Sequence, residues 1–266
     1  MKKKRAYKKI PFSFNRRMVA ISASITGRKN LIHSMVEVDV HDIRKTLREH
    51  REKTGEQLSF TAWIVYALAR TLIEYPHFNA FRKRNKLILL DDVTVSVLVE
   101  RKLNEEKVPE PLGIQKAQEK SYRQIHDEIR QAQQQENQEL GGLSKMTWVK
   151  YIPSFLMRAF FRLASANIRM NIRYGVVSVT AVGMFGKSAN WFIPHGGATI
   201  LLTVGSIAER PVIRDGNYEN REHLCLTISF DHIIIDGAPG ARFTKDLCHQ
   251  LKDIGELKKN LNNYYP

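Results

Sequence analysis

The chain has 266 residues, of which 43% are hydrophobic and 26% are charged; this is the usage of soluble globular domains and excludes a disordered chain, a fibrous repeat or a disulfide-stapled miniprotein. Lysine and arginine number 42 against 27 aspartate and glutamate residues, giving a formal net charge of +15, which suits an anionic partner such as nucleic acid, a membrane surface or a phosphate-bearing ligand. Cys225 and Cys248 lie in apolar contexts without CxxC spacing, so we expect buried free thiols in a reducing compartment and no zinc site.

The N-terminal seventeen residues, MKKKRAYKKIPFSFNRR, carry eight basic residues and no acid. We interpret residues 1–17 as a solvated basic arm, followed by a single domain over residues 18–266. No long apolar run follows the arm, so it does not resemble a secretory signal. No stretch of about 18 uncharged apolar residues predicts a spanning helix, and we expect a cytoplasmic protein.

Strands and helices are expected to alternate along the domain. Period-two alternation and β-rich apolar runs predict strands over 32–40, 92–99, 175–183, 197–207 and 223–231. Charge spacing, apolar periodicity and stop signals such as Gly55 and Pro76 predict helices over 42–54, 60–75, 114–138 and 238–258. This interleaving predicts one α/β domain.

One segment departs from this pattern. No acidic residue occurs between Glu139 and Glu209, and within it lies an atypical basic amphipathic insert at about 140–174. Four arginines, at 158, 162, 169 and 173, share one face if residues 150–173 form a single helix with roughly 100° per residue. Such a helix is either a core helix with a solvated arginine stripe, or one that lies on an anionic membrane or covers a lipid-like acceptor site.

The strongest candidate for chemistry is FDHIIIDGAPGARF, residues 230–243. A histidine at the end of a strand is held by rigid backbone while its ring faces a cleft, and its ordinary pKa near neutrality suits a general base. An isolated HxxxDG is weak evidence, since a DG turn after a strand that ends in a packed histidine has the same pattern.

The same residues resemble a known family. DHIIIDGAPGARF is similar to the DHRxxDGAxxARF signature of the dihydrolipoyl acyltransferase cores of 2-oxoacid dehydrogenase complexes, and chloramphenicol acetyltransferase has a related HxxxDG. GVVSVTAVGMFG with ATILLTVGSI resembles the family's GTFTISNLGMFG and AAILAVGRI. LIHSMVEVDVHDIRK resembles its IPH…EVDVT block, and the following SFTAWIVYALARTLIEYPHFNAFR resembles its T…FIVKALALALKEFPELNAS block. The similarity covers about residues 10–125 and 175–258. It implies a two-layer, mixed-sheet α/β (α+β) sandwich of the chloramphenicol acetyltransferase-like type.

The resemblance also implies roles for individual residues. His232 would be the general base, Thr180 would donate a hydrogen bond to the tetrahedral oxyanion, and Asp236 would hold the site by pairing with Arg16 or Arg17. Possible substrate contacts, by position in the matching blocks, are His33, Asn79 and His195; for His33 a packed or channel-lining role is an equal alternative to catalysis. No cluster of side chains has metal-ligand spacing, and no Walker or Rossmann loop is present.

This sequence departs from the family at several points. Ile233 replaces the arginine that follows the family's histidine, and Ile193 to Gly197 replaces its Asn-Pro-Pro block. No lipoyl-lysine motif, linker or subunit-binding domain precedes the core. We therefore expect a stand-alone acyltransferase that takes its acyl group from acyl-CoA or a separate acyl carrier.

Two other classes of function compete with this interpretation. A non-catalytic trimeric scaffold or membrane adapter would retain the fold, although it would have no need for His232, Thr180 and Asp236 together. Nucleic-acid binding rests on charge alone, without a helix-turn-helix or aromatic-basic motif, and is disfavoured. The resemblance further predicts a homotrimer, or a multiple of one, with active sites between subunits.

Overall fold

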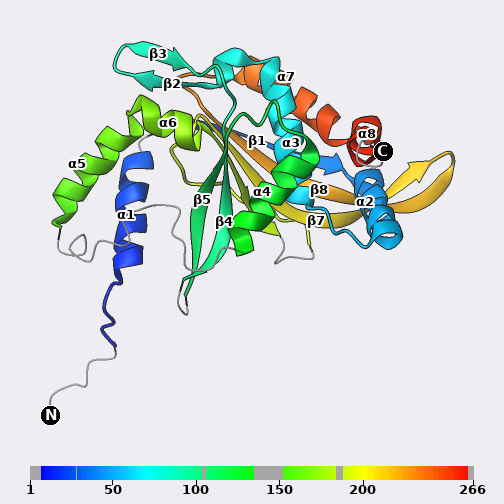
Figure 1. The fold of residues 1–266 in the computed structure, drawn as a ribbon, viewed down its shortest axis with the longest axis horizontal. Coiled ribbons are helices and arrows are strands. Elements are labelled where there is room, and N and C mark those ends of the chain that lie inside the picture. The colour runs from blue at the N-terminus through cyan, green and yellow to red at the C-terminus, as the bar shows by residue number, and fades with distance from the viewer. Residues whose placement is uncertain (1–6, 28, 104–105, 135–151, 184–187, 263–266) are drawn as a thin grey trace.

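The computed structural model describes residues 7–27, 29–103, 106–134, 152–183 and 188–262 (Figure 1). The strands are β1 (Leu31–Asp39), β2 (Ala80–Lys83), β3 (Lys86–Leu89), β4 (Val95–Leu103), β5 (Glu106–Ile114), β6 (Val177–Ala181), β7 (Ile200–Arg214) and β8 (Asn217–Asp231). The helices are α1 (Phe14–Thr26), α2 (His41–Thr54), α3 (Phe60–Ile73), α4 (Tyr122–Gln134), α5 (Ser154–Ser165), α6 (Ile168–Tyr174), α7 (Gly237–Leu251) and α8 (Ile254–Asn262), with a 3-10 turn η1 (Pro76–Phe78).

Six strands form one mixed sheet in the order β1-β8-β7-β6-β4-β5, while β2 and β3 form a separate hairpin. β6 runs parallel to β4 and β7, and the other pairs are antiparallel. The long β7–β8 hairpin, drawn in yellow in Figure 1, turns at Asp215 and Gly216, which both have positive φ. Two successive left-handed residues are typical of the tight turn whose twist matches the flanking strands.

One face of the sheet is apolar and carries the core. Leu226, Ile228 and Phe230 of β8 point to it, as do the alternate residues of β7, β6 and β4 that are paired with them in register. The nearly all-apolar α3 and the helix α7 pack there, and Trp63 of α3 donates its indole hydrogen to the carbonyl of Leu251 at 3.1 Å. The expected sandwich of a mixed sheet with a helical layer is confirmed.

The opposite face of the same strands is polar. The residues between the apolar ones include Ser96, Ser178, Thr180, Thr203, Thr227, Ser229 and Asp231, and β1 adds His33. Because side chains alternate across a strand, hydroxyl groups spaced by two along four neighbouring strands gather on one surface. Of the residues that the sequence marked for chemistry, Thr180 and His33 lie on this surface.

Two expected helices differ from the structure, and one strand was not expected. Residues 106–114 are β5, although the sequence there has two prolines; β5 is an edge strand, where a missing N–H costs no ladder bond. The helix expected over 114–138 begins only at Tyr122, and the helix expected over 238–258 is divided into α7 and α8.

The single helix expected over 150–173 is likewise two helices. α5 ends at Ser165, and the Asn167 side chain caps α6 by accepting hydrogen bonds from the backbone of Arg169 at 2.9 Å and Met170 at 3.4 Å. A side chain that accepts hydrogen bonds from the first free N–H groups of a helix favours the start of a new helix at that residue over the continuation of the preceding one. The four arginines therefore do not form one continuous stripe.

The basic arm overlaps a helix. α1 begins at Phe14 and is capped by Ser13, so Arg16 and Arg17 lie in its first turn. α1 packs side by side with α5 through Ile21 and Met157, which form a small cluster separate from the main core (Figure 1). None of the described helices is long and apolar enough to cross a membrane.

Candidate active site

His232 directly follows the end of β8. Its backbone N–H donates to the carbonyl of Asn30 at 2.8 Å, which fixes the position of the residue beside the start of β1. The ring is half exposed (48%), and Nδ1 lies 3.3 Å from the carbonyl oxygen of Ile235. Because a carbonyl only accepts, this contact favours the tautomer with the proton on Nδ1. Nε2 is then the nitrogen with a free lone pair, as a general base requires.

Asp236 lies next to the same ring. Its Oδ1 is 3.6 Å from Nδ1 of His232, and its side chain is 83% exposed at the start of α7. In the described part of this chain Asp236 forms no ion pair with Arg16 or Arg17. That pairing stays a prediction.

Thr180 lies on β6, half-buried, and its hydroxyl has no hydrogen-bond partner among the described residues. It is in register with Thr203 of β7, which is in register with Thr227 of β8, five residues before His232. Two strand spacings of about 4.8 Å and five residues at about 3.3 Å each separate the Cα atoms of Thr180 and His232 by roughly 20 Å. One chain therefore does not bring the expected base and oxyanion donor to a common atom.

The three expected substrate contacts lie in different surroundings. His33, exposed on β1, has Nδ1 2.7 Å from the buried hydroxyl of Ser229. Asn79 is buried, and its amide donates to the carbonyls of Leu90 and Asp92, which ties the β2–β3 hairpin to the start of β4. His195 places Nε2 2.9 Å from the carbonyl of Ala23 and so joins its loop to α1. Direct substrate contacts by these residues stay predictions.

A pocket of about 660 Å³ is lined by the two sequence neighbours of His232, Asp231 and Ile233, while His232 itself is not in its wall. Lys29 makes an ion pair with the buried Asp231 at 2.7 Å, so these charges balance. Arg82 and Arg84 of the β2–β3 hairpin also line the pocket, and neither has a carboxylate partner among the described residues. The pocket is therefore net positive and of the size of a small-molecule site, which suits phosphate groups.

Sequence reasoning missed this pocket. A charged residue at the end of an apolar strand could have marked Asp231, but no local pattern relates it to Lys29, which is distant in sequence. The two arginines belong to a run of basic residues, FRKRNK, which by itself is typical of any solvated hairpin.

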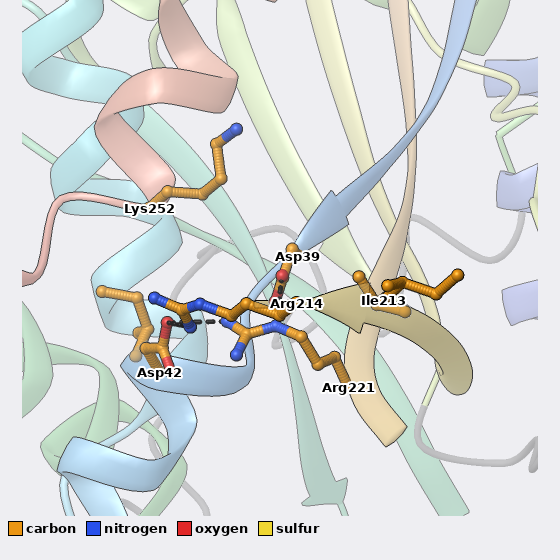
Figure 2. A pocket seen from close by; sticks show the side chains of 8 residues that line it. Asp39, Asp42, Ile213, Arg214, Arg221 and Lys252 are labelled. Atoms are coloured by element: carbon orange, nitrogen blue, oxygen red, sulfur yellow. Dashed lines mark hydrogen bonds and ion pairs between the residues drawn. The ribbon is translucent and has the colours of Figure 1, made fainter. Parts of the chain in front are cut away.

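A second, smaller pocket of about 260 Å³ lies over an ion-pair cluster (Figure 2). Buried Arg221 contacts Asp39 and Asp42 at 2.6 Å each and Glu219 at 3.0 Å. Burial alone would raise the pKa of Asp39, but the hydrogen bonds from Arg221 and from the backbone of His41 outweigh it and hold that pKa below its ordinary value. The ion pairs of the cluster join β1, α2 and β8, as in a structural site.

Neither cysteine is a favourable nucleophile. Cys225 is buried and Cys248 is half-buried; both are free, and burial raises the pKa of each thiol, which disfavours the nucleophilic thiolate. No group of three or more His, Cys, Asp or Glu side chains that could hold a metal ion occurs within the described ranges.

A family model described as 2-oxoacid dehydrogenases acyltransferase (catalytic domain) matches residues 5–147 and 168–258. The chain belongs to this family. The match includes His232, Thr180 and Asp236 and confirms the resemblance that the motifs indicated. It leaves out residues 148–167, so α5 lies in a segment that the family model does not describe.

Individual relatives agree with this assignment. The chain is 27% identical over 256 residues to the lipoamide acyltransferase component of the branched-chain alpha-keto acid dehydrogenase complex of Bacillus subtilis, which covers 94% of this chain and 53% of the relative. Its fold is similar to a probable dihydrolipoamide acetyltransferase of Listeria monocytogenes (TM-score 0.68, 21% identity, 98% of each chain). It is equally similar to the cubic core of a pyruvate dehydrogenase multienzyme complex (TM-score 0.68, 21% identity, 94% of each chain). The chain spans about half the length of the curated relatives it matches.

Proposed function

We propose that this protein is a CoA-dependent acyltransferase that moves an acyl group between a thioester donor and a hydroxyl, amine or thiol acceptor. The observation that carries the proposal is the His232 ring, held at the end of β8 with Nδ1 against the carbonyl of Ile235 and Nε2 available. Family membership supplies the reaction class, since the matching model is that of an acyltransferase catalytic domain.

The chemistry follows from the roles of three groups. The oxygen, nitrogen or sulfur of the acceptor attacks the thioester carbonyl carbon. As it does so, Nε2 of His232 takes the proton from that attacking atom. The Thr180 hydroxyl donates a hydrogen bond to the oxygen that becomes negative, and such a donor typically lowers the barrier by about 2.7–4 kcal/mol. The tetrahedral intermediate then expels the CoA thiolate, which recovers the proton from the imidazolium. Asp236 orients the ring from the Nδ1 side.

The active site in this proposal lies between subunits of a homotrimer or a multiple of one. Within one chain the register separates Thr180 from His232, and the ring of His232 is half exposed, whereas an acyl-transfer site has to exclude water. A neighbouring subunit that brings its Thr180 to His232 would place both groups in one site and would cover the exposed ring. The multienzyme core with a similar fold is consistent with such an assembly.

The pocket beside His232 is our proposed donor site. Arg82 and Arg84 would meet the phosphates of acyl-CoA, or the phosphopantetheine of a separate acyl carrier, while the thioester reaches toward Nε2. Ile233, 53% exposed where relatives of this motif have arginine, makes one wall apolar and favours an uncharged group there.

A thiol-release assay with a panel of acyl-CoA donors and candidate acceptors tests the proposal. We expect His232→Ala to lower the rate by about 10²–10⁴ because it removes the general base, with unchanged circular dichroism. His249→Ala, the same substitution on the exposed side of α7, is the matched control and should keep full activity. Equal rates for the two variants, or no thiol release with any donor, would favour the non-catalytic trimeric scaffold or membrane adapter instead.

A further inference from the structure

α5 has two apolar faces, and only one is covered. Met157 and Phe161 pack against α1. On the other side, Phe155 is 67% exposed and Leu163 is 73% exposed, with Leu156 and Phe160 also exposed between them. At roughly 100° per residue these four side chains span roughly 140° of the helix. A surface helix ordinarily has polar residues on its outer side, so we expect the exposed apolar face of α5 to bind a partner.

The surroundings of this face are uniformly basic. α1, α5 and α6 contain six arginines and no acidic residue, and the first acid of the whole chain is Glu37. Arg158 and Arg162 are exposed along one edge of the apolar face, and neither has a carboxylate partner among the described residues. On neighbouring α1, Val19 is exposed, and the preceding arm exposes Ile10 and Phe12 beside Lys8 and Lys9.

We infer that the α1–α5 unit docks peripherally on an anionic phospholipid bilayer, with Phe155, Leu156, Phe160 and Leu163 inserted among the acyl chains near the headgroups. Arg158 and Arg162 then lie at the level of the lipid phosphates. This combination of bulky apolar side chains on one face with flanking arginines is typical of helices that lie in a membrane interface.

Two observations favour a bilayer over a second copy of this chain. A symmetric contact between two such units would bring arginines together without any carboxylate to offset them, whereas lipid phosphates match their charge. Within this unit α5, which carries the exposed apolar face, also lies outside the part of the chain that the family model describes, so the oligomeric core of the family has no need of that helix. In Figure 1, α1 and α5 lie at the opposite end of the molecule from α2 and α8.

Flotation with phosphatidylcholine vesicles, with and without one third phosphatidylglycerol, tests this inference on the full chain. We expect binding only to the anionic vesicles and weaker binding as salt rises, because the screening length falls from about 10 Å at 0.1 M to about 3 Å at 1 M. Each arginine near an anionic surface strengthens binding about fivefold, so Arg158→Gln with Arg162→Gln should weaken it about 25-fold. Phe155→Gln with Leu163→Gln should also weaken binding, although it leaves the charge unchanged.

The control is Lys258→Gln with Lys259→Gln, which removes the same charge from exposed positions on α8 and should bind like the unchanged protein. Each variant is also measured by light scattering. Absence of binding at low salt, equal binding to neutral vesicles, or an equal loss in the α8 control would overturn the inference. So would a smaller oligomer in the Phe155→Gln, Leu163→Gln variant, because the apolar face would then be a contact between subunits.

Discussion

Subunit mixing can test whether His232 and Thr180 meet across chains. The strand register puts them roughly 20 Å apart in one chain, so His232→Ala and Thr180→Ala chains each retain one half of a shared site. In a ring with head-to-tail interfaces, random mixing of equal amounts pairs an intact His232 with an intact Thr180 at about one interface in four. Co-expressed variants should therefore recover about a quarter of the unmutated rate.

Two differently tagged variants are co-expressed and assayed for thiol release before and after purification over both tags; in a trimer, that selection raises the expected recovery from about a quarter to about a third. The variants alone provide a low background, since losing the base costs about 10²–10⁴ and losing the oxyanion donor about 10²–10³ in rate. The matched control co-expresses the unmutated chain with the double variant. Before tag selection, that mixture should keep about a quarter of the activity if the site is shared between chains. About half would remain if each chain had its own site. No recovery in verified mixed oligomers, together with one half in the control, would refute the shared site.

Three further results are expected. Thr180→Ala should lower kcat about 10²–10³-fold and change KM little, because its hydrogen bond strengthens in the transition state; Thr180→Ser should restore most of the rate, and a pure KM effect would contradict this role. Arg221→Gln should cost about 1–3 kcal/mol of unfolding free energy in urea at neutral pH, since three partly exposed carboxylates lose their hydrogen-bond partner and remain close together. The pKa of Asp39 is lowered in the folded state, so its contribution is full above its ordinary value of about 3.9 and is lost as the pH falls through the folded pKa. The loss of unfolding free energy at acid pH should therefore be smaller in Arg221→Gln. If the unfolding free energy of the variant depends on pH as in the unmutated protein, Arg221 does not lower the pKa of Asp39. Gly175→Ala should destabilise the fold more than Gly216→Ala, because both glycines have φ near +80° but a Cβ at Gly175 collides with the Thr94 carbonyl while Gly216 faces open space; equal thermal shifts would contradict the steric reasoning.

Features that depend on neighbours in sequence were predictable. β1, α2 and α3 begin and end within two residues of their expected bounds, because periodicity, Gly55 and Pro76 act locally. The break at Asn167 and the strand β5 were not predicted. The Asn167 cap ends one helix and starts another while the spacing of apolar residues in the sequence stays the same, so the pattern does not reveal the break. The two prolines of β5 are tolerated because the strand lies at the sheet edge, and that position is known only from the order of the strands.

The sequence by itself determined the family and the α/β class. It also selected His232 as the candidate base, since the motif of that histidine is contiguous and includes its own strand end and turn. Only the tertiary structure decided the rest. The polar face that holds Thr180, the ion pair of Lys29 with Asp231 and the arginine-lined pocket arise from strands and loops far apart in the chain. The exposed second face of α5 was likewise decided by packing, because a helix that is apolar on both sides in sequence does not specify which side its neighbour α1 covers.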